Sequence, residues 1–549
     1  MRKLFSVFAG VLKKPVQGRL FAYLLMLNAV SNCCICIHYQ QFVPILCMLT
    51  LAGLTAYVES AVCMLIRFRW LRLLTLLLFV VVHNLLIVAD YFLVYQFHMA
   101  LGQDAVDVLA ETNAVEAANF LETYLNGWNL LLWLLFLVAL NYVLLLLSRF
   151  LSRINFWAHM AILIVVCGVA VMGTCVYNFS VYRDGMSIPQ FQTPTRIGYA
   201  LYVLHQRQQK IVMLRAVCSS VRATTVDPAD SVPTVVVVIG ESFCTYHSSL
   251  SGYEKPTNPN LGRRVSEGSL RVFDDVVSIA CATHGAMLSV FSVDSLGVSF
   301  GEQPLFPACF KAAGYRTFMY DNQYIVGMGV TFLTDRELSN QLFDYRNADR
   351  ATYDLSMVQT IEPQPEPALY VIHLWGQHYT YAERYPSDFA RFTAADYDPE
   401  RWTESQREVM AHYDNATLYN DYVVDQIIKK FEHQNCVVVY FSDHGEEIYD
   451  LNGYMGHGNA EHTSDLSYQL RVPFMVWTSP TFSRPDVARR IDAATHLPAM
   501  TDDVPHLLFD LAGIATDCFK PTHSVVSEEY DVRKQRVVLH SIDYDRTKK

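Results

Sequence analysis

Residues 436–446 read Cys-Val-Val-Val-Tyr-Phe-Ser-Asp-His-Gly-Glu. The stretch up to Phe441 is apolar, rich in β-branched side chains and free of charge, which is typical of a strand buried on both faces of a parallel sheet. Four further runs share this character and alternate with helical stretches: Thr234–Ile239, Tyr315–Tyr320, Ala368–Leu374 and Val472–Trp477. We therefore expect an α/β domain over residues 234–549, with a largely parallel central sheet.

Polar side chains that suit a metal ion follow three of these runs. Asp443 and His444 come soon after Phe441, Glu241 follows the run that ends at Ile239, and His378 lies a few residues beyond Leu374. In parallel sheets, ligands collect at the carboxyl ends of the strands. Carboxylate and imidazole groups are good ligands for zinc or a similar divalent ion. The sequence therefore predicts a metal site at this edge of the sheet.

A candidate nucleophile precedes the apolar stretch Met287–Phe291, which we expect to be helical. Thr283 then lies near the N-terminus of this helix, where free N–H groups and the helix dipole favour an anion. A hydroxyl is a poor nucleophile at neutral pH, but a metal ion can favour its alkoxide and polarise a phosphoryl oxygen. From local sequence alone, the default role of Thr283 is that of a helix cap, and Cys281 and His284 are competing reactive residues.

The first third of the chain has the composition of a membrane domain. The whole chain is 52% hydrophobic and only 17% charged, and the apolar residues are concentrated before about residue 182. A membrane-spanning helix needs about 20 apolar residues. We expect five spans: two within 20–58, and one each over 70–92, 128–148 and 156–178. The net charge of −11 argues against a nucleic-acid partner.

Lysine and arginine indicate how these spans are oriented. They occur before the first span, between the second and third, and between the fourth and fifth, whereas residues 38–42 and 97–127 contain none. The positive-inside rule places the N-terminus in the cytoplasm and the C-terminal domain on the far side of the membrane. The expected organisation is a transmembrane domain at 1–182, an amphipathic bridging helix and linker at 183–233, and a catalytic domain at 234–549.

Two acidic residues and one loop of this region are candidate functional elements. Glu59 and Asp90 are ionisable residues of the predicted spans, and a charge within a bilayer is costly, although both lie near span ends where they can reach the interface. The acidic loop 97–127 is expected to form short amphipathic helices at the outer membrane surface.

The cysteines of the outer domain leave their pairing open. They contain no Cys-x-x-Cys pair, which disfavours a zinc ribbon or a redox motif. A disulfide framework and buried single thiols are both compatible with their positions: Cys218, Cys244, Cys281, Cys309, Cys436 and Cys518.

Three segments together carry a family resemblance: Val238–Ser242, Ser249–Tyr253 with Thr257–Pro259, and Ser442–Glu446. With these segments, the whole chain resembles the phosphoethanolamine transferases of the alkaline-phosphatase and sulfatase superfamily, membrane enzymes that modify lipid A or the lipopolysaccharide core. The resemblance implies a zinc-dependent enzyme with one metal ion, or a second in addition. It also implies residue roles: metal ligands at Glu241, Thr283, Asp443 and His444, with Thr283 as nucleophile, and substrate contacts at His378, His457, Thr112 and Glu116.

The chain departs from the family pattern in places. The nucleophile segment, Cys-Gly-Thr-Ala-Thr in the family, reads Ile-Ala-Cys-Ala-Thr at 279–283, and the Ser-His-Gly-Pro stretch of many relatives reads Gln-His-Tyr-Thr at 377–380. The outer domain is poorer in cysteine than the polymyxin-resistance members of the family. These departures leave open which acceptor the protein uses and how its cysteines pair.

The expected activity is transfer of phosphoethanolamine from phosphatidylethanolamine to a lipid A or lipopolysaccharide acceptor, through a covalent intermediate on Thr283. The protein is expected to be a monomer in the bacterial inner membrane, with its catalytic domain in the periplasm. The alternatives are a phosphoglycerol transferase of the lipoteichoic-acid-synthase type, which the 252–259 segment disfavours, and a non-catalytic membrane-anchored binding protein. Sulfatase activity is disfavoured because the Cys/Ser-x-Pro-x-Arg segment is absent around Cys281.

Overall fold

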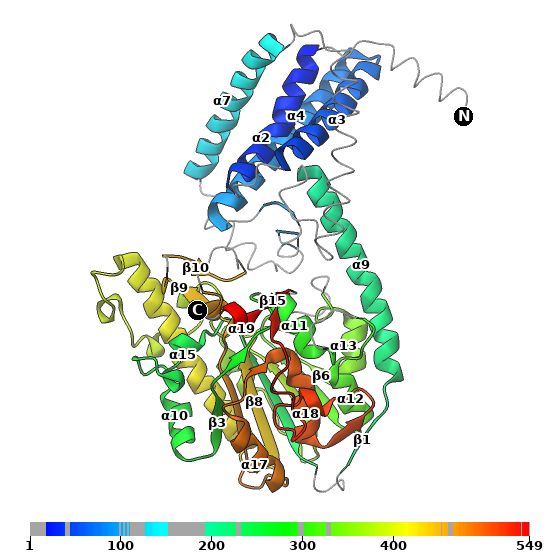
Figure 1. Cartoon of the computed structure of the whole chain (residues 1–549). Coiled ribbons are helices and arrows are strands. Elements are labelled where there is room, and N and C mark those ends of the chain that lie inside the picture. Colours follow the sequence, from blue (N-terminus) through cyan, green and yellow to red (C-terminus); the bar gives the residue numbers. More distant parts are fainter. Residues whose placement is uncertain are drawn as a thin grey trace. The chain divides into compact units, whose positions relative to one another are not determined.

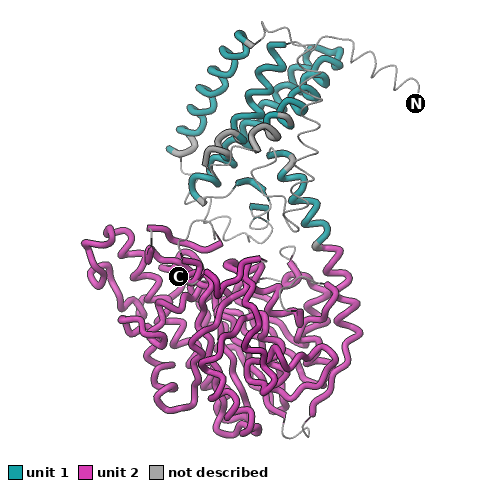
Figure 2. Tube along the Cα trace, viewed as in Figure 1, with its two compact units in different colours: residues 1–207 teal, residues 208–549 magenta. Residues whose placement is uncertain are grey.

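The computed structural model describes residues 18–38, 44–97, 100–102, 105–106, 109, 127–151, 193–226, 232–294, 301–324, 331–451, 453–458, 465–539 and 541–547. The chain forms two compact units, Met1–Arg207 and Gln208–Lys549 (Figure 2). The units divide within helix α9 (Thr193–Ser220), which contains the amphipathic stretch of the predicted bridge.

The first unit is helical (Figure 1). Four of its helices coincide with four of the predicted spans: α2 (Gly18–His38), α3 (Pro44–Leu65), α4 (Arg69–Phe97) and α7 (Gly127–Leu151). Within the described residues, two helices are long and apolar enough to cross a membrane, over Arg69–Gln96 and Leu131–Phe150, whereas α2 and α3 carry shorter apolar stretches. The fifth predicted span, 156–178, lies outside the described residues, so the five-span topology stays a prediction.

The outer faces of α4 and α7 are aliphatic. Leu77 and Leu85 on α4 are exposed, as are Leu132 and Val138 on α7. A helix in water turns its apolar stripe inward and its polar face to the solvent. Rows of exposed aliphatic side chains on two long helices are instead what a lipid environment requires.

Both ionisable residues of the predicted spans are buried and paired. Glu59 Oε1 lies 2.6 Å from His83 Nε2, and both oxygens of Asp90 accept hydrogen bonds from Arg196 Nη2 at 2.7 Å. Asp90 and Arg196 are 1% and 3% exposed. The alternative that these carboxylates reach outward from span ends is therefore wrong, because each has a partner inside the unit that offsets the cost of burying its charge.

A seven-stranded mixed sheet forms the centre of the second unit, with the strand order β3-β11-β8-β2-β7-β5-β6 (Figure 1). Each of the five apolar runs in the sequence forms a strand, and two short strands at the sheet edges add to them. In sheet order the strands are β3 (Leu270–Phe273), β11 (Phe474–Thr478), β8 (Cys436–Ser442), β2 (Thr234–Gly240), β7 (Ala368–His373), β5 (Arg316–Asp321) and β6 (Tyr345–Arg346).

The prediction of parallel pairing is confirmed for the centre of the sheet and wrong for β11. Strands β8, β2, β7, β5 and β6 pair in parallel, whereas β11 is antiparallel to both β8 and β3. After β8 the chain stays at the same edge of the sheet, where Gly445 N donates to Gln469 O at 2.8 Å. A parallel neighbour needs a crossover back along the sheet. Among the described residues between β8 and β11, the only helix is the short α16 (Ser467–Leu470), and no crossover helix is present, so β11 starts from that edge and runs in the opposite direction.

Helices cover both faces of this sheet. Alternate residues of β2 belong to different apolar cores, Val235 and Val237 to one and Val236 and Val238 to the other. Because both faces are buried, the strands read as unbroken apolar runs. The first core includes α11 (Thr283–Phe291), α12 (Phe306–Ala312), α13 (Arg336–Leu342), α17 (Pro485–Ala494) and α18 (Val504–Ala512), and the second includes α10 (Pro259–Ser266), α14 (Asp354–Gln359) and α15 (Glu404–Phe431).

Two-stranded ladders and one short C-terminal helix complete the described part of the second unit. The ladders are β1 (Ala223–Thr225) with β13 (Ile514–Thr516), β4 (Val276–Val277) with β12 (Ala499–Met500), β9 (Glu447–Ile448) with β10 (Met455–Gly456), and β14 (Val537–Val538) with β15 (Ile542–Asp543). The helix is α19 (Tyr544–Thr547).

Candidate active site

The register of the sheet brings Glu241 and Asp443 to one edge. Gly240 of β2 pairs with Ser442 of β8, so the two parallel strands end at the same level. The residues that follow are therefore neighbours, and Asp443 N donates to Gly240 O at 3.1 Å. The expectation that chemistry collects at the carboxyl ends of these strands agrees with this geometry.

Four side chains meet at this edge. Thr283 Oγ1 lies 3.2 Å from Glu241 Oε2 and 3.3 Å from His444 Nε2. His444 Nε2 in turn lies 3.4 Å from Glu241 Oε1 and 3.3 Å from Asp443 Oδ2. Glu241, Asp443 and His444 are completely buried, and their ligand atoms lie within 4.8 Å of one another. The four residues singled out from the sequence thus share one site, while the role of each stays a prediction.

The surrounding hydrogen bonds turn these groups toward a common point. His444 Nδ1 donates to Gly445 O at 2.8 Å, which leaves Nε2 facing the carboxylates. Asp443 Oδ1 accepts from the backbone N–H groups of Ser242 and His444, at 3.1 and 2.7 Å. Asp443 Oδ2 is buried and has no hydrogen-bond partner among the described residues. Burying such an oxygen is costly unless a cation lies beside it, so this set of carboxylate and imidazole donors fits a divalent ion such as zinc.

The titration behaviour of the site shows the same excess of negative charge. Burial and the neighbouring Glu241 raise the pKa of Asp443 to about 7. Burial alone would lower the pKa of His444, but the two carboxylates outweigh it and raise that pKa to about 10. Burial likewise opposes ionisation of Glu241, yet the charge and hydrogen bond of His444 hold its pKa well below the usual range. The cluster therefore holds positive charge strongly, as a metal site must.

Thr283 begins helix α11, as the sequence predicts. The capping position is Ala282, which is extended and has no capping side chain, so the alternative that Thr283 is the helix cap is wrong. Cys281 is only 5% exposed and packs against Ile279 and Leu470 in a small apolar cluster. The local fold thus brings the Thr283 hydroxyl, rather than the Cys281 thiol, to the carboxylates.

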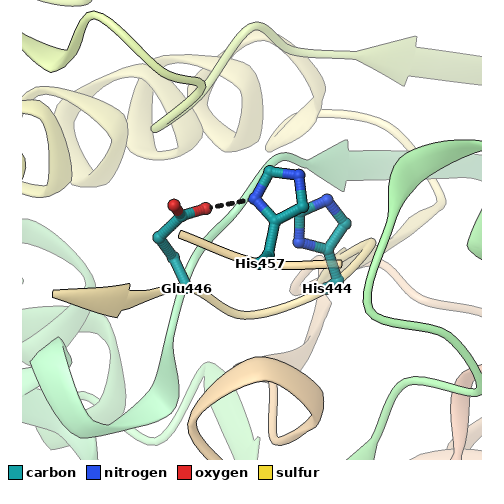
Figure 3. Close-up of side chains that lie close together, drawn as sticks. All are labelled: His444, Glu446 and His457. Atoms are coloured by element: carbon teal, nitrogen blue, oxygen red, sulfur yellow. Dashed lines mark hydrogen bonds and ion pairs between the residues drawn. The ribbon is translucent and has the colours of Figure 1, made fainter. Parts of the chain in front are cut away.

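His457 lies beside this group (Figure 3). The centroids of the His457 and His444 rings are 4.1 Å apart. Glu446 is buried beneath them: its Oε2 lies 2.6 Å from His457 Nδ1, and its Oε1 accepts from Tyr381 Oη at 2.9 Å. Glu446 therefore fixes the ring so that Nδ1 faces the carboxylate. Glu446 is not among the site residues predicted from the sequence, although it ends the Ser442–Glu446 motif.

Comparison with known protein families explains this arrangement. A family model described as Sulfatase matches residues 233–514, which is just over half of the chain and includes every strand of the central sheet. The chain belongs to the sulfatase family. The match contains Glu241, Thr283, Asp443 and His444, so the site described above lies inside the sulfatase-family domain.

Matches to individual relatives are more specific than the match to the family model. The chain is 32% identical over 314 residues to phosphoethanolamine transferase EptC of Escherichia coli strain K12. The match covers 54% of each protein, so this chain spans about half the length of that curated relative. The crystal structure of the C-terminal periplasmic domain of EcEptC from Escherichia coli in complex with Zn is 30% identical, with a TM-score of 0.53, and the match covers 59% of this chain and 96% of that one.

A third relative shares the fold over nearly the whole length. The integral membrane protein lipooligosaccharide phosphoethanolamine transferase A (EptA) from Neisseria meningitidis superposes with a TM-score of 0.60, covering 92% of this chain and 97% of that one at 18% identity. At this identity the likeness concerns the fold alone. It shows that a fold similar to that of nearly the whole chain is found in another protein.

In this sulfatase-family domain, His378 lies on the turn after β7 and is half-buried. Its charge helps to lower the pKa of Glu241, although less than that of His444 does. Gly376 in the same turn adopts a left-handed φ of 49°, and a Cβ there would lie 2.9 Å from Glu241 N. Glycine therefore allows the turn to pack directly against the Glu241 backbone.

Gln323 is a site residue that the sequence analysis missed. Its Nε2 donates to Glu241 Oε2 at 3.0 Å and to Leu374 O at 2.8 Å. Gln323 follows β5, whose apolar run is already recognised in the sequence, so examining the polar residues after that run would have identified it. Thr112 and Glu116, the two predicted contacts to the ethanolamine head group, lie outside the described residues.

The six cysteines of the second unit are free thiols. Cys309 and Cys518 interact through their side chains, and this hydrogen bond lowers the pKa of Cys518 to about 6. Cys436 is completely buried in β8, where it behaves as a small apolar residue.

A second histidine of the domain also lies between two carboxylates. His247 Nδ1 is 2.7 Å from Asp414 Oδ1, and His247 Nε2 is 3.4 Å from Asp450. Tyr253 and Tyr397 donate to the other oxygen of Asp414 at 2.7 and 2.6 Å. Burial alone would lower the pKa of His247, but the two carboxylates raise it to about 10. The His247 ring is thus a buried cation with its own counter-ions.

Proposed function

We propose that this protein transfers phosphoethanolamine from phosphatidylethanolamine to a lipid A or lipopolysaccharide acceptor, with Thr283 as the nucleophile. The observation that carries this proposal is the contact of the Thr283 hydroxyl with both Glu241 and His444, at 3.2 and 3.3 Å. The likeness to proteins named phosphoethanolamine transferases supports the choice of the transferred group.

Glu241, Asp443, His444 and Thr283 would together hold a zinc ion. A bound divalent ion supplies two things in such a site, a lower pKa for the hydroxyl and a positive charge beside the phosphoryl oxygens. The structure with zinc of the EptC periplasmic domain supports this choice of metal. His444 Nδ1 donates to Gly445 O and so keeps its proton, which leaves Nε2 as the atom that would bind the ion.

The reaction is a two-step transfer. In the first step the Thr283 Oγ–phosphorus bond forms, the bond from phosphorus to the diacylglycerol oxygen breaks, and the hydroxyl proton is transferred in net terms to that oxygen. In the second step a hydroxyl or phosphate oxygen of the acceptor forms the new bond to phosphorus and the Thr283 Oγ–phosphorus bond breaks. Thr283 Oγ takes up the proton that the acceptor hydroxyl loses or, with an ionised phosphate as acceptor, a proton from solvent. α11 contributes its N-terminal N–H groups to the negative charge on the phosphoryl oxygens.

His457 and His378 are proposed to contact the substrate. His457 is fixed by Glu446 with Nε2 directed away from that carboxylate, so it can donate a hydrogen bond to a phosphoryl or departing oxygen. Thr112 and Glu116 are proposed to contact the ethanolamine group, where the Glu116 carboxylate suits its positive charge. The proposed organisation is a transmembrane domain at 1–182, a bridge at 183–233 and a periplasmic catalytic domain at 234–549 of a monomeric inner-membrane protein.

The decisive experiment follows the covalent step. Full-length protein in detergent micelles is incubated with phosphatidylethanolamine, digested and examined by mass spectrometry. The expected result is one phosphoethanolamine group on the peptide that contains Thr283, absent from the Thr283→Ala variant and retained at a reduced rate in Thr283→Ser. An adduct on Cys281, or an adduct with unchanged yield in Thr283→Ala, contradicts the proposal.

The same preparation separates the proposed donor from its nearest rival. With phosphatidylglycerol in place of phosphatidylethanolamine, we expect no adduct on Thr283. A phosphoglycerol group on Thr283 would instead identify a phosphoglycerol transferase. Transfer onward is measured by adding a lipid A-type glycolipid, whose mass should increase by one phosphoethanolamine group.

A further inference from the structure

A cluster of two arginines on one tryptophan lies beside the proposed metal site. Trp375 is the second residue after β7, and the guanidinium carbons of Arg384 and Arg350 lie 4.1 and 4.8 Å from the centroid of its ring. Arg384 is 8% exposed, whereas Arg350 and Trp375 are half-buried. We refer to Arg350, Trp375 and Arg384 as the arginine–tryptophan cluster.

The tryptophan of this cluster is held rigidly. Asp354 is buried and accepts the backbone N–H groups of Trp375 and Gly376 through its two oxygens, at 2.8 and 2.9 Å. Asn322 Nδ2 donates to the same carboxylate at 2.8 Å. The Asp354 carboxylate therefore fixes the turn on which the two guanidinium groups rest.

A short chain of contacts joins the cluster to the metal site. Arg350 Nη1 donates to Gln323 O at 3.4 Å, and the Gln323 side chain donates to Glu241 Oε2 at 3.0 Å. His378 is on the same turn as the tryptophan: its N–H donates to Trp375 O at 3.1 Å, and the two rings are 6.5 Å apart. The positive charge of Arg350 thus lies one residue away from a proposed metal ligand.

Two guanidinium groups held on one ring suit an anion such as phosphate, and Arg384 Nη2 also donates to Glu383 Oε2 at 3.1 Å. A guanidinium group stacked on an aromatic ring keeps its plane, so its N–H fork is already oriented for bidentate contact with a phosphate. Little side-chain entropy is then lost when the anion binds. A purely structural stack is the alternative, and Arg401 on Trp402, at 4.2 Å, is an example of one on the exposed surface of the same domain.

We propose that the arginine–tryptophan cluster binds a phosphate group carried by the acceptor glycolipid. This inference rests on the proposed function, because it uses the position of the donor. The one phosphate of phosphatidylethanolamine must reach Thr283 and is accounted for by the metal site. A second site for a phosphate, next to the first, therefore suits the other reactant, and it favours acceptors that bear a phosphate of their own.

The first test measures binding and does not depend on turnover. Glucosamine 1-phosphate is titrated by calorimetry into full-length protein in detergent micelles. We expect Arg350→Gln to weaken binding roughly tenfold, as loss of a charge-assisted hydrogen-bond pair does. Arg401→Gln, the matched surface stack, should bind as the wild type does. Equal binding by Arg350→Gln and wild type, or binding that is lost only when Asp443 is changed to Asn, overturns the proposal.

The second test separates the two half-reactions. Arg350→Gln should form the Thr283 adduct at the wild-type rate within about twofold, and should then transfer it to a bisphosphorylated diglucosamine lipid with roughly tenfold lower kcat/KM. With the monophosphorylated lipid the loss should be smaller. A slower adduct step with unchanged onward transfer means that the cluster serves the donor, and this overturns the proposal.

The Arg384→Lys variant is the control for a folding defect. It keeps the charge but loses the planar fork, so an intermediate loss in glucosamine 1-phosphate binding is expected. Binding by Arg384→Lys as tight as in the wild type contradicts a role of the stacked guanidinium. If the wild type forms no Thr283 adduct but binds glucosamine 1-phosphate in the Arg350-dependent way, the proposed function fails while the phosphate site stands.

Discussion

His444 and His247 each lie between two carboxylates of the same domain, and the geometry around the two rings differs. At His247 each ring nitrogen has a carboxylate of its own, and tyrosine hydroxyls occupy the remaining oxygen of Asp414. At His444 both carboxylates face the single nitrogen Nε2, at 3.3 and 3.4 Å, and Asp443 Oδ2 has no hydrogen-bond partner among the described residues.

We propose that this difference separates a structural ion pair at His247 from a metal site at His444. The His247 imidazolium is itself the cation that its carboxylates need, so nothing further is required. The carboxylates at His444 converge with the Thr283 hydroxyl on one point, as the ligands of a single ion do. Composition alone, one histidine with two acidic residues, cannot tell the two sites apart. The directions of the lone pairs do so.

The largest difference is expected in activity when one carboxylate of each site is neutralised. Asp443→Asn should lower phosphoethanolamine transfer by about 10³-fold or more, since a bound metal contributes several kcal/mol of transition-state stabilisation. Asp414→Asn should leave the transfer rate of the folded protein within about tenfold of wild type. Transfer rates of the two purified variants test this prediction. Similar losses of activity in both variants would contradict the proposed difference between the two sites.

Chelation should affect only the His444 site. In the wild type, removal of the metal should lower the free energy of unfolding by about 4 kcal/mol where free metal had been near 1,000 times its dissociation constant. In Asp443→Asn the chelator should have almost no effect, because the site no longer holds the ion. Thermal unfolding of both proteins with and without chelator measures this. A chelator effect of equal size in the variant contradicts the assignment.

Removal of His247 should mainly reduce stability. His247→Asn leaves Asp414 and Asp450 without their cation, and breaking a buried ion pair from one side costs about 3 kcal/mol or more. Metal content should not change. Denaturant unfolding of the full chain in detergent, with metal analysis of the same samples, tests both statements. A variant as stable as the wild type would show that His247 is not the structural cation inferred from its contacts.

The pH dependence of stability should identify the same histidine. Its pKa is about 10 in the folded protein and near 6.5 in the unfolded chain, so protonation favours the folded state. The stabilising contribution is complete below about pH 6.5 and is lost as the pH rises toward 10. Unfolding free energies across this range should therefore fall more steeply for the wild type than for His247→Asn. Parallel curves of unfolding free energy against pH for the two proteins would contradict the raised pKa of His247.

Much of the fold of the second unit could be predicted because its strands are determined by local sequence patterns. Each apolar run forms a strand, and the polar residues after β2 and β8 meet because parallel strands share one edge. The direction of β11 could not be predicted, since it depends on where the segment after β8 travels. Nor could the stacking of Arg350 and Arg384 on Trp375, because it joins residues from separate segments through side-chain contacts with no local pattern.

In the first unit, the helices could be predicted from the sequence, whereas the ion pairs between them could not. Its helices follow from long apolar stretches, but the burial of Glu59 and Asp90 does not, because their partners His83 and Arg196 come from other helices. A charge near the end of an apolar stretch reads as interfacial when its partner is unknown. Long-range pairing, rather than any weakness of the helix pattern, is what the sequence does not reveal there.

Metal content tests the central claim most directly. Purified full-length wild type, Glu241→Gln and Asp450→Asn are equilibrated with equal zinc, passed through a desalting column and analysed by mass spectrometry for bound metal. We predict that the ion bound at Glu241, Thr283, Asp443 and His444 remains in the wild type and in Asp450→Asn, and that Glu241→Gln loses it. Wild-type zinc content in Glu241→Gln would contradict the account.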